Sequence, residues 1–148
     1  MRVEGREWPT DYRGPLWIHA ANSAPTEEAI RDCENFYESL YTGVAERPQF
    51  PLRYPTGVLL GRVELVDCLT QQDYRISTPP KIAEIHDSKF HHIVINPMKL
   101  IVPIRMHGGK QIYNMEREIW EGAKKGLRRI CTSWWPPDEE VEDSDLFS

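Results

Sequence analysis

The chain has 148 residues, of which 40% are hydrophobic and 28% are charged, proportions that fit one globular domain and exclude a fully disordered chain. Its net charge of −5 comes from residues 138–148, which hold six acidic residues and no basic one, whereas the remainder holds 18 basic and 17 acidic residues. The overall acidity therefore does not exclude a polyanionic partner.

The first half of the chain predicts a strand, a helix and a long strand. Alternating apolar residues from Pro15 to Ala21 predict a strand. Ile30, Cys33, Phe36 and Leu40 recur at helical spacing after an acidic first turn, and Gly43 ends that run. Residues 57–69 are rich in β-branched and aliphatic side chains and predict one long strand, in which Gly61 indicates a bend or a close backbone approach.

The second half predicts further short strands and a second helix. Residues 70–89 are polar, contain Pro79-Pro80 and predict a loop. Residues 90–95 and 99–104 predict two strands separated by an Asn96-Pro97 turn, and residues 111–113 predict a third. A helix capped by Asn114 is expected to follow and to end at Gly126. Its apolar stripe would be Met115, Ile119, Ala123 and Leu127.

These elements predict an α+β fold, a small mixed β-barrel of five or six strands with two flanking helices. Closure of the sheet, or near closure, is expected because it would hide the edges of the strands. No apolar run approaches the about 20 residues that a bilayer-spanning helix needs, and the N-terminus has no apolar stretch typical of a secretory signal. We therefore expect no membrane partner.

The sequence gives little support to a catalytic or a metal-binding site. Three separated cysteines without a C-x-x-C pair indicate reduced thiols, and Cys33 and Cys68 are expected to lie inert on apolar faces. Adjacent strand residues point to opposite faces, so neighbouring histidines do not easily share one ion. We expect no metal and no other cofactor. The metal candidates considered are Glu84, His86, Asp87, His91 and His92.

Two features are compatible with nucleic-acid binding. Residues 124–129 (KKGLRR) form a dense basic cluster, which either holds phosphates or is a solvated helix end that complements the helix dipole. Trp134-Trp135 are either a stacking platform for single strands or hydrophobic plugs of the barrel. Trp8, Trp17 and Trp120 are expected in the core. Glu4 and Arg6 lie on one face of an extended segment, where they can pair or read a ligand together.

The order of five segments resembles one known family. VEGREW at 3–8, YRGPLWIHAA at 12–21, YPTGVLLGRVELVDCL at 54–69, INP at 95–97 and EGAKKGL at 121–127 closely resemble the ASCH domain of a transcription coactivator. The resemblance extends to about Arg129. It implies an ASCH domain with a PUA-like β-barrel, which we assign to residues 1–137. Residues 138–148 lie outside the resemblance, and their acidic composition predicts a disordered tail.

The resemblance also implies a nucleic-acid partner, DNA or RNA, bound in a basic cleft without strong sequence specificity. Protein subunits of a coactivator and ribosome-rescue complex are the alternative partners, and the location implied is nuclear and cytoplasmic. The residues expected to line the cleft or hold phosphates are Arg6, Arg13, Lys110, Lys124, Lys125, Arg128 and Arg129.

The chain departs from the family motif G-x-K-x-x-E-x-R at its start. Glu4 and Arg6 match the last two motif positions, whereas Met1 stands where the Lys belongs, and the strand and helix that precede the motif have no counterpart. Relative to the family the chain is thus expected to be an N-terminally truncated product or a fragment. Family members that look like hydrolases use the Lys and a Thr at the position of Glu4, so we expect no enzymatic activity here. An RNA-directed hydrolase or nuclease, using Glu4, Arg6 and His19, is the third hypothesis.

Overall fold

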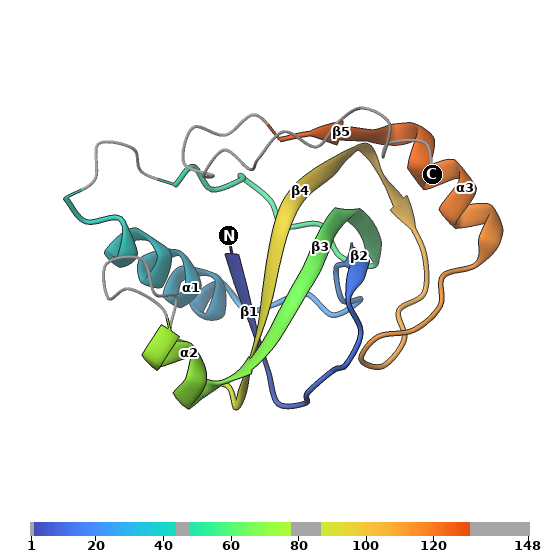
Figure 1. Ribbon diagram of the computed structural model, residues 1–148. Helices are drawn as coiled ribbons and strands as arrows, with labels where there is room; N and C mark the ends of the chain where they lie inside the picture. Colours follow the sequence, from blue (N-terminus) through green and yellow to red (C-terminus); the bar gives the residue numbers. More distant parts are fainter. Residues whose placement is uncertain (1, 44–47, 78–86, 131–148) are drawn as a thin grey trace.

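The computed structural model describes residues 2–43, 48–77 and 87–130, and within these ranges it contains five strands and three helices (Figure 1). This confirms the α+β class. The predicted strand near residues 15–21, the helix ending at Leu40 and the long strand near residues 57–69 are all present. The elements are β1 (Arg2–Arg6), β2 (Gly14–His19), α1 (Glu27–Leu40), β3 (Val58–Thr70), α2 (Gln71–Ser77), β4 (Phe90–Arg105), α3 (Arg117–Gly126) and β5 (Leu127–Arg129).

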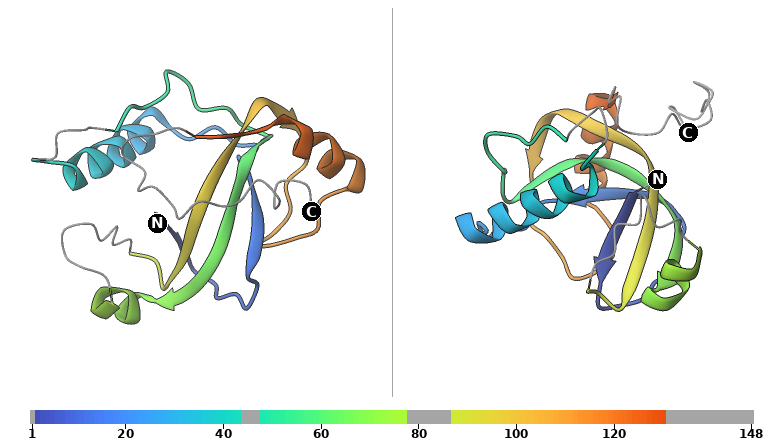
Figure 2. Two further views of the ribbon diagram at one scale, coloured as in Figure 1. Left: turned by 45° about the horizontal axis from the view of Figure 1, so that its top comes forward. Right: turned by 90° about the vertical axis from the view of Figure 1, so that its left-hand side faces the viewer.

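The strands form one antiparallel sheet built on the long pair β3 and β4. The strand order is β1-β4-β3-β2, and the short β5 pairs with β4. The expected closed barrel is not present among the described residues, because β1 and β2 remain the two edges of the sheet. Three register shifts interrupt the β3–β4 ladder, and such irregularities bend and twist a sheet. The result is a curved, open sheet (Figure 2).

Strand β4 is continuous, so the predicted turn at Asn96-Pro97 is wrong. Asn96 adopts a left-handed conformation (φ 51°), which Asn tolerates better than most residues, and its side-chain amide donates to Glu64 on β3 at 3.1 Å. Proline lacks an N–H for the ladder but is tolerated at a bulge, and a register shift lies opposite, between Arg62 and Glu64. The backbone therefore kinks at these residues without ending the strand.

Two small cores lie against the sheet. Leu59, Leu100, Ala123 and Leu127 are buried together beneath α3. Val3, Tyr74 and Ile93 form the second cluster, to which α2 contributes Tyr74. Helix α2 lies in the segment for which the sequence predicts a loop. The hydroxyl of Thr70 caps it by accepting from the backbone N–H of Asp73, and burial of Tyr74 supplies the packing that polar composition conceals.

Helix α1 has the predicted bounds but not the predicted burial. Thr26 caps it by accepting a hydrogen bond from the backbone N–H of Ala29. No residue of the helix is buried, and Cys33, expected in the core, is exposed. The reason is that α1 projects away from the sheet, as both views in Figure 2 show.

The segment between β4 and α3 also differs from the prediction. Residues 111–113 are not a strand, because Gln111 takes a left-handed conformation (φ 54°) that interrupts extended backbone. Helix α3 begins at Arg117 after Glu116, and not after Asn114. It ends at Gly126 as predicted, but Leu127 leaves the helical stripe and enters β5. No helix among the described residues is long and apolar enough to span a membrane.

The close approach of β3 and β4 at Gly61 yields a stability prediction. A Cβ at Gly61 would collide with the backbone carbonyl oxygen of Met98, and backbone atoms on a paired strand cannot move aside cheaply. Gly61→Ala should lower the free energy of unfolding by about 2 to 3 kcal/mol. The measurement is urea unfolding followed by circular dichroism.

Gly122 in α3 provides the matched control, because a Cβ there would meet no atom within 4 Å. Gly122→Ala should raise the free energy of unfolding by about 0.5 to 1 kcal/mol through helix propensity. Equal stabilities of the two variants would contradict the assigned β3–β4 register.

Candidate nucleic-acid-binding cavity

A cavity of about 1070 Å³ reaches from one edge strand of the sheet to the other. Its walls come from β1, the connection 7–13, β2 with the two residues 21–22, the connection 106–116 and Trp120 of α3, together with Leu59 of β3 and His92 of β4. Because the sheet curves without closing, its two edges border one shared space. We name this space the aromatic cavity. Its aromatic lining residues are Trp8, Tyr12, Trp17, Tyr113 and Trp120, and its titratable polar ones are Glu4, Arg6, His19 and His92.

The charged end of the aromatic cavity is the side-chain pair of Glu4 and Arg6. The two residues lie two apart on β1 and share one face of the strand, as predicted, and their side chains form an ion pair. The side chain of Arg6 is 44% exposed and that of Glu4 is 37% exposed, so a ligand in the cavity can reach both. Burial lowers the pKa of the Arg6 guanidinium, which nevertheless stays protonated in proteins.

His92 lies beneath this pair and joins it to the aromatic wall. It is opposite Glu4 in the β1–β4 ladder, and its ring packs edge-on against the ring of Trp8 at a centroid distance of 4.8 Å. Its Nε2 lies 3.1 Å from the backbone carbonyl oxygen of Trp8, so the bonded tautomer carries the proton on Nε2. Burial lowers the pKa of His92, and Arg6 lowers it further, whereas the bond to Trp8 opposes the shift.

The neighbouring His91 points to the other face of the sheet and stacks on Tyr74 at a centroid distance of 4.6 Å. The predicted separation of His91 and His92 is therefore confirmed. Within the described ranges no three His, Cys, Asp or Glu side chains lie close enough together to hold a metal. Glu84 and His86, two of the considered ligands, lie outside those ranges.

The three tryptophans expected in the core line the aromatic cavity, and Trp17 also packs against the core cluster beneath α3, as expected. Trp17 lies on the edge strand β2 and Trp120 lies on α3, where it remains 38% exposed. Trp120 follows Ile119 by one position and is therefore rotated off the apolar stripe of the helix, a signal present in the sequence. The ammonium of Lys124 sits 3.4 Å from the centre of the Trp120 ring. One cation thereby reaches the rim of the cavity.

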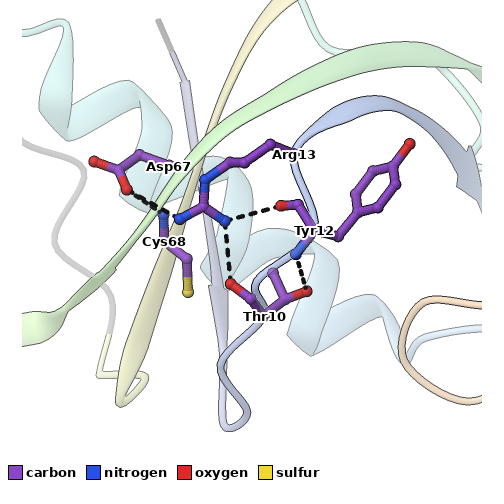
Figure 3. A network of polar contacts seen from close by, with 5 residues as sticks. All are labelled: Thr10, Tyr12, Arg13, Asp67 and Cys68. Atoms are coloured by element: carbon purple, nitrogen blue, oxygen red, sulfur yellow. Dashed lines mark hydrogen bonds and ion pairs between the residues drawn. The ribbon is translucent and has the colours of Figure 1, made fainter.

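The connection between β1 and β2 is held to the sheet by Arg13 (Figure 3). Its guanidinium donates to the carbonyl oxygens of Thr10 at 3.1 Å and Tyr12 at 2.8 Å, and it pairs with Asp67 of β3 at 3.3 Å. Asp67 also accepts the backbone N–H of Cys68 at 2.8 Å. Arg13 thus positions the strand connection that carries Tyr12, and its own side chain does not line the cavity.

The structure separates the other basic residues expected in one cleft. Apart from Arg13, six residues are expected there, and of these Arg6 lines the aromatic cavity and Lys124 contacts its rim. Lys110 lies in the lining connection 106–116 without being a lining residue itself. The remaining three, Lys125, Arg128 and Arg129, lie at the end of α3 and on β5, away from the lining. Trp134-Trp135 and the acidic segment 138–148 lie outside the described residues.

The sequence alone assigns no binding role to any of the five aromatic lining residues, Trp8, Tyr12, Trp17, Tyr113 and Trp120, and it considers His92 only as a metal ligand. They come from separate segments that only the tertiary fold brings together. The curvature that gathers them depends on the β3–β4 register shifts, which no local pattern specifies.

An open antiparallel sheet with helices at its sides and a cleft marked by Glu4 and Arg6 defines the class of protein. The ASCH domain model matches residues 2–125, and the chain therefore belongs to the ASCH domain family. It is similar to Activating signal cointegrator 1 of Mus musculus and of Homo sapiens, with 38% identity over 128 residues in each case. The match covers 86% of this chain and 21% of each relative, so the chain spans about a fifth of their length.

The lowered pKa of His92 makes stability depend on pH. The unfolded chain binds a proton at this residue near the ordinary pKa of about 6.5, whereas the folded chain resists protonation until lower pH. Stability is therefore full above about pH 6.5 and falls as the pH decreases below it. His92→Gln can still donate to Trp8 but does not titrate, so its stability should fall less between about pH 7 and pH 5.

Urea midpoints at several pH values in that window measure this difference, and all other titrating groups are common to both proteins. Parallel pH curves for the wild type and His92→Gln would contradict the buried neutral state of His92.

Proposed function

We propose that this ASCH domain is a non-enzymatic module that binds single-stranded nucleic acid, with an unpaired base in the aromatic cavity. The observation that carries the proposal is the composition of that cavity. Five aromatic rings line it, and its charged lining residues, Glu4 and Arg6, are already paired with each other. Such a site favours a flat, neutral ligand over an ion.

A nucleobase meets these requirements. Stacking on an aromatic side chain stabilises a bound base by about 1 to 3 kcal/mol. The exposed carboxylate of Glu4 can accept from an exocyclic amine, and the guanidinium of Arg6 can donate to a ring nitrogen or carbonyl oxygen. A base inside a duplex would present only its edge, so we expect single strands to bind more tightly than matched duplexes.

The cations around the cavity supply contacts to the backbone. Lys124 on the Trp120 ring is placed for a phosphate next to the bound base. Lys110 lies in the connection 106–116, and Lys125 and Arg128 continue the positive surface beyond α3. These residues attract any phosphate chain regardless of sequence, so specificity should be weak and binding should fall steeply with salt.

The cavity lining favours binding over catalysis. The described lining holds no Ser, Thr, Cys or Lys, and the carboxylate that it does hold, Glu4, is paired with Arg6 and is not poised as a free nucleophile. The relatives are named for cointegration of an activating signal. We extend that context to this chain as a module of a transcription coactivator-like protein, acting in the nucleus and cytoplasm on DNA or RNA.

A protein-interaction module is the second candidate, and helix α1 favours it. Its half-buried apolar residues include Ile30, Phe36 and Leu40, which belong to neither core cluster of the described residues, and Cys33 is exposed. Binding of this kind would survive moderate salt, because it would depend on apolar contacts. A titration of binding against salt concentration therefore distinguishes the two functions.

The test is fluorescence anisotropy with labelled single-stranded and duplex DNA and RNA, titrated with salt. Trp120→Ala should lower single-strand affinity by about 10-fold while leaving the salt slope unchanged. Lys124→Ala should reduce the slope of log affinity against log salt by about 0.7, the value for one phosphate of a single strand.

Arg117→Ala is the matched control, since Arg117 is an exposed cation on the same helix that pairs with Glu121 and does not line the cavity. It should leave both affinity and slope near the wild-type values. Binding that is unaffected by Trp120→Ala, or no binding by folded protein at low salt, would contradict the proposed function.

A further inference from the structure

A second positive surface lies where α3 ends and β5 pairs with β4. Lys99 of β4 is directly opposite Arg128 of β5, and both side chains are exposed. The Arg128 guanidinium donates to the carbonyl oxygens of Lys125 at 3.4 Å and Leu127 at 2.6 Å, which fixes it beside the last turn of α3. We name Lys99, Lys125 and Arg128 the β5 patch. None of the three lines the aromatic cavity.

Unlike Arg6, Arg13, Lys89 and Arg117, the cations of the β5 patch have no carboxylate partner among the described residues. Two like charges directly opposite each other on neighbouring strands destabilise a sheet. Among the described residues, no carboxylate lies within ion-pair distance of Lys99, Lys125 or Arg128. The described ion pairs are instead Arg6 with Glu4, Arg13 with Asp67, Lys89 with Glu7, and Arg117 with Glu121. An anionic partner at the patch would relieve the repulsion.

We infer that the partner of the β5 patch is the acidic segment 138–148 of the same chain. This segment holds six carboxylates and no basic residue. Residues 130–137 connect it to β5, and eight residues can span up to about 28 Å, which is ample for a return to the patch. A short covalent connection also gives an effective concentration of about 1 mM, so even weak charge pairing is populated within one chain.

The pairing has a consequence that rests on the proposed function. Lys125 directly follows Lys124, the cation on the Trp120 ring, in the last turn of α3. A phosphate chain that passes Lys124 would therefore meet the β5 patch next, where the acidic segment would compete with it. The base-binding cavity itself stays open. The acidic segment therefore lowers the affinity for nucleic acid at low salt and loses this effect at high salt. While it occupies the patch, binding depends more strongly on the base in the cavity.

The experiment compares the full chain with a variant in which four acidic residues of the segment are neutral: Glu139→Gln, Glu140→Gln, Glu142→Gln and Asp143→Asn. Backbone amide shifts in NMR spectra without nucleic acid give the first readout. Neutralisation should shift the amides of Lys99, Lys125 and Arg128 at about 50 mM salt, and the differences should collapse at about 500 mM. Anisotropy gives the second readout, with single-strand affinity rising about 3- to 10-fold at low salt.

The matched control neutralises four exposed carboxylates of α1 instead: Glu27→Gln, Glu28→Gln, Asp32→Asn and Glu38→Gln. It changes the net charge equally, so it should leave the β5 patch amides unmoved and raise affinity by less than the segment variant does. A third protein combines the neutral segment with Lys99→Ala and Arg128→Ala, and it should lose the gain in affinity.

The outcomes separate the two claims. Amide differences confined to the altered segment, or an equal gain in affinity from the α1 control, would overturn the inference. Shifts at the β5 patch in a chain that binds no nucleic acid would support the intramolecular pairing and refute the proposed function. Nucleic-acid binding that is identical in all variants, without patch shifts, would support the function and refute the pairing.

Discussion

The antiparallel pairing of β3 with β4 is the constraint on which the rest of the structure depends. Every other strand attaches to this pair: β2 to β3, and β1 and β5 to β4. The approach at Gly61 brings the two backbones together, and the three register shifts bend them. A flat pair would leave β1 and β2 at distant edges, whereas the bent pair allows one cavity to reach both. The site is therefore a product of backbone irregularity in the central ladder.

The strands and connections around the β3–β4 pair also determine which cations have a carboxylate partner. Near the cavity, Arg6 and Arg13 are neutralised by Glu4 and Asp67. Arg6 presents a paired donor to the cavity, and Arg13 fixes the connection that carries Tyr12. The end of α3 instead concentrates cations with the opposite property, since no carboxylate of the described residues pairs with Lys125. The domain thus combines a nearly neutral cavity with a positively charged surface at the end of α3. That division suits a ligand made of flat bases on a polyanionic backbone.

How far the sequence predicts the structure depends on the range of the interactions involved. Local signals are sufficient for α1, where Thr26 caps an apolar repeat, and for β3, where β-branched and aliphatic residues predominate. They fail at Asn96-Pro97, because β4 takes up an extra residue there against β3 and continues as one strand, and at α2, because burial of Tyr74 outweighs polar composition. Glu4 and Arg6 are predictable as a same-face pair. The aromatic cavity is not, since its walls come from separate segments that only the curved sheet assembles.

The central claim is that an unpaired base occupies the aromatic cavity, and photo-cross-linking tests it most directly. A single-stranded oligonucleotide carrying one 5-iodouracil is irradiated with the full chain, and the linked peptides are identified by mass spectrometry. We predict cross-links to Trp8, Tyr113 or Trp120, suppressed by an unlabelled single strand and much weaker with the matched duplex. Cross-links confined to β5, with the cavity aromatics unlabelled at saturating oligonucleotide, would contradict the claim.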